Sequence, residues 1–201
     1  MIVPARALAL MSRVASDSTS PVELVVGDNK SHASFVAQVG EYRVQVTARL
    51  LEGPYPNYEQ VIPKDNPRQL TVTRSDLMDA VDIVASHADS NTQQVRFSVS
   101  NGGLEVSSAT ADFGSGSQRI EAEYKGEEME IGYNARYLLQ TLRNIPTEKV
   151  VFRLKTALSA GIVEPVGALP QVDEELLCLV MPLRLPDNAP TAETAKAGAR
   201  G

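Results

Sequence analysis

The clearest pattern in the chain is an alternation of apolar and polar residues. From Tyr42 to Leu50 every second residue is apolar or aromatic, and the residues between them are Arg, Gln or Thr. Because successive side chains of a strand point to opposite faces, this alternation predicts a strand with one buried face. The residues before it predict a short apolar start at Ile2-Val3, a helix over Pro4–Ala15 and strands at Val22–Val26 and Ala33–Val39.

The same order of elements recurs twice. The second copy is expected to contain a strand at Leu70–Thr73, a helix capped by Ser75 and ending near Ser86, and strands at Val95–Val99, Leu104–Ser108 and Arg119–Tyr124. The third is expected to contain a strand at Met129–Tyr133, a helix at Ala135–Asn144, and strands at Val150–Leu154, Gly161–Glu164 and Leu176–Leu183. Three β-α-β-β-β units with a period of roughly 60 residues predict a repeated fold of the α+β class.

Proline-rich sequence separates the first copy from the second. Three prolines lie in the two stretches Tyr55–Tyr58 and Ile62–Pro67. Because proline at this density breaks helices and central strands, we expect a linker here, between domains at residues 1–66 and 67–185. Residues 186–201 are rich in Ala, Thr, Pro and Gly without a periodic apolar pattern, which predicts a disordered tail.

The first and third helices each carry two arginines seven residues apart. This spacing is nearly two helical turns, so Arg6 and Arg13 share a face, as do Arg136 and Arg143. Gln140 extends the second of these faces. Surface helices often carry arginines without a role, but recurrence at matching positions favours contacts to phosphates, which need no base readout. The apolar residues expected to pack on the sheets are Leu8, Leu10, Met11, Val14, Leu138, Leu139 and Leu142.

The middle helix departs from this arginine pattern. It carries Asp76 and Ile83 at the matching positions, together with Asp79 and Asp82. Three acids on one helix are a weak signal for a metal, and no histidine or further carboxylate lies beside them, so we expect no metal site.

Composition gives no support for catalysis. The two histidines, His32 and His87, lie near no second ligand or nucleophile, and Asp112-Phe113-Gly114 matches a kinase triplet without the other kinase motifs. We therefore expect no catalytic residues, metal or cofactor.

Charge, cysteine content and hydropathy bear on partners and compartment. The formal charge of −6 means that any DNA contact must come from locally gathered positive charge. The lone Cys178 permits no disulfide within the chain, which fits a cytoplasmic protein, and no segment has the ~20 apolar residues that span a membrane.

Several motifs together resemble a known family, the β sliding clamp of bacterial DNA polymerase III. They are Ile2-Val3-Pro4 opening a helix, Tyr55-Pro56-Asn57-Tyr58 with Val61-Ile62-Pro63, Glu130-Ile131-Gly132-Tyr133-Asn134, and Val180-Met181-Pro182-Leu183-Arg184-Leu185. The resemblance covers about residues 1 to 185. It implies a DNA-clamp fold with helices on one face of antiparallel sheets. Residues 1–66 would be the C-terminal half of the middle domain, and 67–185 the C-terminal domain.

The resemblance also implies a function. Clamps of this family are non-catalytic processivity factors whose subunits pair into a homodimeric ring that slides on duplex DNA without regard to sequence. Arg6, Arg13, Arg136, Gln140 and Arg143 would face the DNA. The polymerase III catalytic subunit, the clamp loader and repair polymerases would dock short peptides in a groove formed by Pro56, Gln60, Val61, Asn134, Tyr137, Leu179, Val180, Met181, Pro182, Leu183 and Arg184.

The number of units differs from the family pattern, because three are present where six are expected. We therefore expect a fragment or shortened product that does not close a ring alone. Three readings remain open: a clamp segment that tethers a polymerase, a clamp-like module that binds peptides without encircling DNA, and an enzyme with an unrecognised site.

Overall fold

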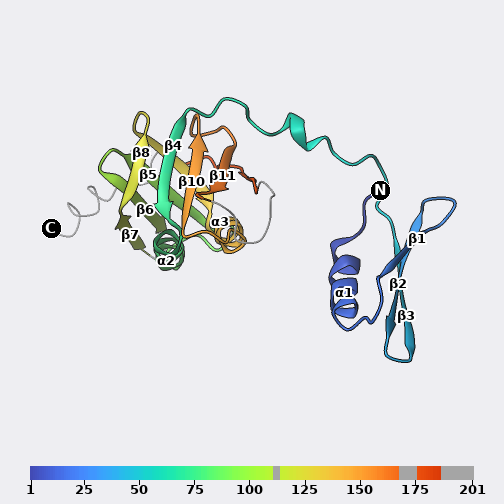
Figure 1. Ribbon diagram of the computed structural model, residues 1–201. Helices are drawn as coiled ribbons and strands as arrows, with labels where there is room; N and C mark the ends of the chain where they lie inside the picture. Colours follow the sequence, from blue (N-terminus) through green and yellow to red (C-terminus); the bar gives the residue numbers. More distant parts are fainter. Residues whose placement is uncertain (111–113, 168–175, 187–201) are drawn as a thin grey trace. The chain divides into compact units, whose positions relative to one another are not determined.

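A computed structural model describes residues 1–110, 114–167 and 176–186 (Figure 1). The expected tail at 187–201 and the pair Asp112-Phe113 lie outside these residues. The chain forms two compact units, Met1–Tyr58 and a second that begins at Glu59. This division lies inside the proline-rich segment, upstream of the boundary expected after residue 66, and the expected domains 1–66 and 67–185 stay predictions.

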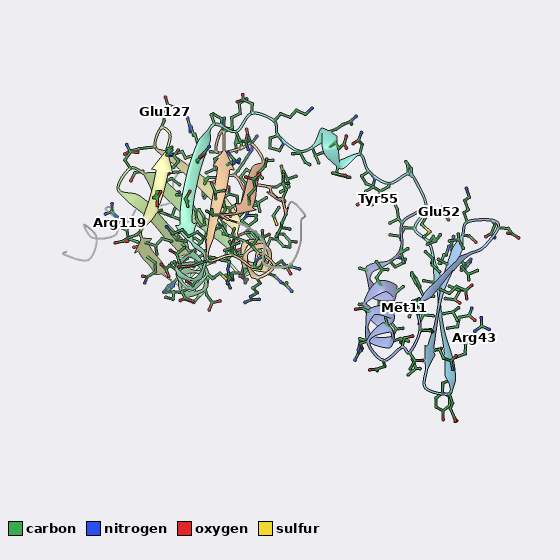
Figure 2. The ribbon with its side chains drawn as sticks, in the orientation of Figure 1. Met11, Arg43, Glu52, Tyr55, Arg119 and Glu127 are labelled. Carbon is green, nitrogen blue, oxygen red and sulfur yellow. The ribbon has the colours of Figure 1, made fainter. Side chains whose placement is uncertain are left out.

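The first unit is one helix on one face of a small sheet (Figure 1). Its elements are α1 (Ala5–Ser16), β1 (Glu23–Val26), β2 (His32–Val39) and β3 (Tyr42–Arg49), with the antiparallel strands in the order β1-β2-β3. Met11 reaches from α1 to the sheet (Figure 2) and packs with Phe35 and Ala37 in a small core.

The expectation that Leu8 and Leu10 pack on the sheet is wrong. Each is 47% exposed, whereas Ala7 and Met11 are buried. Residues four apart share a helix face, and the face that meets the sheet is the one that carries Ala7 and Met11. Leu8 and Leu10 point roughly 100° to either side of it, where this unit has no further element to cover them within the described residues.

The second unit contains two sheets and two helices. Its elements are η1 (Tyr58–Gln60, which begins one residue before the unit), β4 (Arg68–Thr73), α2 (Arg74–Ala85), β5 (Gln94–Ser100), β6 (Gly103–Thr110), β7 (Gly114–Ile120), β8 (Ala122–Lys125), β9 (Met129–Asn134), α3 (Ala135–Arg143), β10 (Lys149–Leu154), β11 (Gly161–Pro165) and β12 (Cys178–Val180). The strand orders are β12-β11-β10-β4-β8 and β7-β6-β5-β9. No helix of the described residues is long and apolar enough to cross a membrane.

Three sequence expectations for this unit need correction. The strand expected at Arg119–Tyr124 is two strands, because the chain leaves one sheet after β7 and joins the other as β8. The last strand is confined to β12, because only those residues pair with β11. Ser75 lies inside α2 rather than capping it; the N-cap is Thr73, and the Ser75 hydroxyl donates to Asp76 instead.

Strand pairing confirms the repeated β-α-β-β-β architecture. In each repeat the first strand pairs with the end of the same repeat: Ile2 with Leu51, β4 with β8, and Gly132 of β9 with Leu183. In the second unit each first strand also joins the sheet of the other repeat, since β4 pairs with β10 and β9 pairs with β5. The two repeats of this unit are therefore completed by exchanging their first strands, and the α+β assignment holds.

The exchanged strands enclose one core. The rings of Phe97, Tyr133 and Phe152 lie at its centre, with centroids 5.3 to 6.4 Å apart. Arg74, at the start of α2, donates through Nε to the carbonyl of Thr147 at 2.9 Å and through Nη1 to that of Leu142 near the end of α3 at 3.5 Å. The start of α2 is thus linked to the end of α3 and to the loop that follows it.

Replacing Phe152 with alanine should destabilise the second unit strongly. The side chain is fully buried, and deleting a buried aromatic ring costs about 3–5 kcal/mol of unfolding free energy. Urea unfolding followed by circular dichroism measures this loss. The matched control is Leu158→Ala, at a site 57% exposed, which should change the unfolding free energy by no more than about 0.5 kcal/mol. Equal losses in both variants would contradict the assignment of the core.

Candidate peptide groove and helix surface

The C-terminal segment that follows β12 is held against strand β9. The amide of Leu183 donates to the carbonyl of Gly132 at 2.8 Å. Gln94, on the neighbouring strand β5, donates through Nε2 to the carbonyl of Arg184 at 2.8 Å. Sequence reasoning missed Gln94, and no local pattern marks it, because its contact lies 90 residues away along the chain.

The approach of the two backbones requires a glycine at residue 132. A Cβ added there would lie 2.7 Å from the carbonyl oxygen of Leu183 and 2.9 Å from a methyl carbon of Leu185. Real Cβ atoms do not come so close to a backbone oxygen, so any side chain at this position would push the segment away. Gly132 therefore fixes where residues 181–185 lie.

The same strand also positions the start of helix α3. Asn134 ends β9 and caps the helix: its Oδ1 accepts from the amide of Tyr137 at 3.1 Å, and its Nδ2 donates to the carbonyl of Thr92 at 2.7 Å. An N-cap side chain of this kind satisfies a donor that the first helical turn leaves free. Tyr137 is consequently held in the first turn of α3, beyond the end of the strand that carries Gly132.

Two large apolar side chains, one in the first turn of α3 and one in the segment after β12, are exposed to solvent. Tyr137 is 69% exposed and Met181 is 65% exposed. Val180, by contrast, is buried in the core, so it anchors the segment from inside. Such exposed side chains on a firmly held frame are suited to burying an apolar side chain of a peptide.

The other expected groove residues are distributed over the two units. Leu179, Pro182 and Leu183 are half-buried and Arg184 is exposed. Gln60 and Val61 are exposed at the beginning of the second unit, whereas Pro56 belongs to the first. That these three residues line one groove with the others stays a prediction.

The thiol and the phenol nearest the segment are not activated for reaction. Cys178 packs against the core, and burial raises the pKa of its thiol. Burial likewise raises the pKa of the Tyr133 hydroxyl. Both groups therefore stay protonated at neutral pH, and neither is activated as a nucleophile.

The arginines of the first and third helices are exposed cations. Arg6 and Arg13 on α1 and Arg136 and Arg143 on α3 are exposed, as is Gln140. None of the four arginines takes part in an ion pair within the described residues. Six other cations do pair with carboxylates, at 2.6 to 3.6 Å: Arg49, Arg68, Arg96, Lys149, Arg153 and Lys155.

Helix α2 presents the opposite charge. Asp76, Asp79 and Asp82 are all exposed on it. Among the residues that the structure describes, no group of three His, Cys, Asp or Glu side chains could hold a metal ion. The helix surface of the second unit is thus basic along α3 and acidic along α2.

Replacing Gly132 with alanine should loosen the C-terminal segment. The added Cβ forces Leu183 away, and loss of one backbone hydrogen bond, worth about 1 kcal/mol, should speed exchange of the Leu183 amide by roughly fivefold or more. Hydrogen exchange read by NMR measures this rate. Gly27→Ala is the control, because an added Cβ there meets nothing closer than 3.6 Å. Unchanged exchange at Leu183 in the Gly132 variant would refute the steric argument.

Comparisons with known proteins agree with this architecture. A family model described as DNA polymerase III beta subunit, C-terminal domain, matches residues 59–184. The beta sliding clamp of Synechocystis sp. is 34% identical over 187 residues, covering 91% of this chain and 45% of the relative. That of Caulobacter vibrioides is 30% identical over 185 residues, covering 92% and 47%. The chain spans about half the length of these curated relatives.

Solved structures give the same result. A sliding clamp from Bartonella birtlesii superposes with a TM-score of 0.78 at 28% identity, covering 92% of this chain and 47% of the other. One from Pseudomonas aeruginosa has a TM-score of 0.75 at 28% identity, with 91% and 47% covered. Because the family model matches well over half of the sequence, the chain belongs to the DNA polymerase III beta subunit family and matches it through the C-terminal domain.

Proposed function

We propose that this chain acts as a non-catalytic sliding-clamp subunit of a bacterial DNA polymerase III. It encircles duplex DNA as part of a homodimeric ring and tethers the polymerase through a peptide-binding groove. The observation that carries the proposal is the held segment at Met181–Arg184 beside the first turn of α3, in a chain of the beta subunit family.

The geometry supports peptide capture. Tyr137 and Met181 are exposed apolar side chains, and the backbone beneath them is fixed by the Gly132–Leu183 and Gln94–Arg184 hydrogen bonds. A rigid frame lowers the entropic cost of binding, because the site is formed before the peptide arrives. Short peptides of the polymerase catalytic subunit, the clamp loader and repair polymerases are the proposed partners.

The charge distribution supports contact with DNA phosphates. Four exposed arginines, two on α1 and two on α3, place positive charge on helix surfaces of a chain whose net charge is −6. A protein that slides needs contacts that are equivalent at every position along the duplex, so phosphates are suitable partners and base edges are not.

A second candidate function is a clamp-like module that binds peptides without encircling DNA. It is favoured by the held segment at Met181–Arg184, whose frame lies within the second unit and needs no contact with DNA. The groove experiment below applies to both functions, and the DNA experiment distinguishes between them.

Replacing Tyr137 or Met181 with alanine should weaken binding at the groove by roughly tenfold or more, the effect of removing an interface hot spot. Griselimycin is a suitable probe, because the Bartonella birtlesii and Pseudomonas aeruginosa clamps were solved bound to it. Calorimetric titration measures the affinity. The control Leu158→Ala removes an equally exposed apolar side chain elsewhere in the second unit and should leave it unchanged. Full affinity in both groove variants would place the binding site elsewhere.

Replacing Arg136 and Arg143 with alanine should reduce the salt dependence of DNA binding. Each phosphate contact contributes about 0.9 to the slope of log affinity against log salt, so the double variant should lose about two units on any duplex sequence. Fluorescence anisotropy over a salt series measures the slope. The charge-matched control replaces Arg49 and Lys155, which pair with Glu52 and Asp65. An unchanged slope in the helix variant would favour the module that does not encircle DNA.

A further inference from the structure

The side chain of Gln94 crosses strand β9 to reach the C-terminal segment. Its neighbour Val95 is buried in the core, so Gln94 lies on the outer face of the sheet, where it is half-buried. Its Nε2 donates to the carbonyl of Arg184 at 2.8 Å. A Cβ added at Gly132 would lie 3.1 Å from this nitrogen, so the glycine also leaves room for the amide to pass over β9.

The hydrogen bond from Gln94 changes the course of the chain after Leu183. In a paired strand the backbone N–H and C=O groups of successive residues point to opposite sides. The amide of Leu183 points to β9, so a continued strand would turn the carbonyl of Arg184 away from β9. That carbonyl instead accepts from Gln94 on β5, the strand beyond β9. The donor at residue 94 therefore fixes where the segment leaves the strand path, and the pairing of Leu183 with Gly132 is a single bridge.

Gln94 is tied to the start of helix α3 as well. It pairs with Asn134, whose Oδ1 accepts from the amide of Tyr137 at 3.1 Å. The backbone carbonyl of Gln94 accepts from the hydroxyl of Ser108 on β6 at 3.3 Å, which holds the residue from the other side. Gln94 is thus linked through its side chain to the segment that carries Met181, and through its backbone to the turn that carries Tyr137.

We propose that Gln94 is a positioning residue of the peptide site. Its amide donor holds the segment that carries Met181 at a fixed distance from Tyr137, and the affinity for a peptide depends on that donor. This inference rests on the function proposed above for the groove. Gln94 acts through the carbonyl of Arg184 and not by touching the peptide, and the position requires a donor, which a glutamine amide supplies and an ionised carboxylate does not.

Two substitutions at residue 94 test the need for a donor. Calorimetric titration of the full chain with griselimycin at pH 7 should show that Gln94→Leu weakens binding about fivefold, the effect of losing one hydrogen bond. Gln94→Glu should weaken it at least as much, because an ionised carboxylate would face the carbonyl oxygen of Arg184. The matched control is Gln118→Glu, which makes the same change at an exposed residue of β7 and should keep full affinity.

Lowering the pH should rescue the glutamate variant alone. A protonated carboxyl group donates through its O–H, so the affinity of Gln94→Glu should rise as the pH falls from about 7 towards the ordinary glutamate pKa of about 4.3. The leucine variant has no donor to regain. The charged groups around this position are Arg184 and the Arg96–Glu130 pair at 2.7 Å. Both arginines stay protonated, and any titration of Glu130 cancels when each affinity is divided by that of the unaltered chain at the same pH.

The outcomes separate this inference from the function on which it rests. Full affinity in Tyr137→Ala and Met181→Ala, or no binding of griselimycin by the unaltered chain, would overturn the groove and the role of Gln94 together. Weakened binding in those two variants with full affinity in both Gln94 variants would overturn the role of Gln94 alone. Equal weakening of Gln94→Leu and Gln94→Glu at every pH would also overturn it, because a general loss of packing does not depend on a donor.

Discussion

The exchange of first strands between the repeats of the second unit is the interaction on which the rest of that unit depends. Strand β4 completes the sheet of the third repeat, and β9 completes that of the second. Neither repeat can bury its inward aromatic residues alone, because Phe97 and Phe152 lie on strands whose second neighbour comes from the other repeat. The exchange joins two small sheets around one core and sets α2 against α3.

The candidate groove is a product of the same exchange. Strand β9 has one edge in the sheet of the second repeat, where Gln94 lies on its neighbour β5, and its other edge receives Leu183. The C-terminal segment is thereby held by residues of both repeats at once. Asn134, the last residue of β9, then begins α3. One strand thus places the segment and the helix turn, which explains how two sites distant in sequence share a rigid frame.

Sequence patterns predicted the parts of the fold that are local. Period-two and helical spacing located the helices and most strands to within a few residues, since each depends on nearby side chains. The break at Glu121 was missed, because it is set by which sheet accepts the strand and not by the residue itself. The exposure of Leu8 and Leu10 was missed for a similar reason: helical spacing marks apolar faces but does not say how many neighbours cover them. At the groove, the resemblance supplied the segment and Tyr137, whereas Gln94 could be found only from the folded backbone.

Strand exchange also has a consequence for biosynthesis. Strand β4 emerges from the ribosome long before β10, with which it pairs from Thr73–Lys149 to Arg68–Leu154. Until the third repeat has been translated, the second repeat has an unfilled sheet and an exposed apolar face, a state prone to aggregation. The second unit can therefore complete its folding only after its third repeat has left the ribosome. Contacts so distant in sequence favour slow folding, and the nascent chain is a natural client for chaperones.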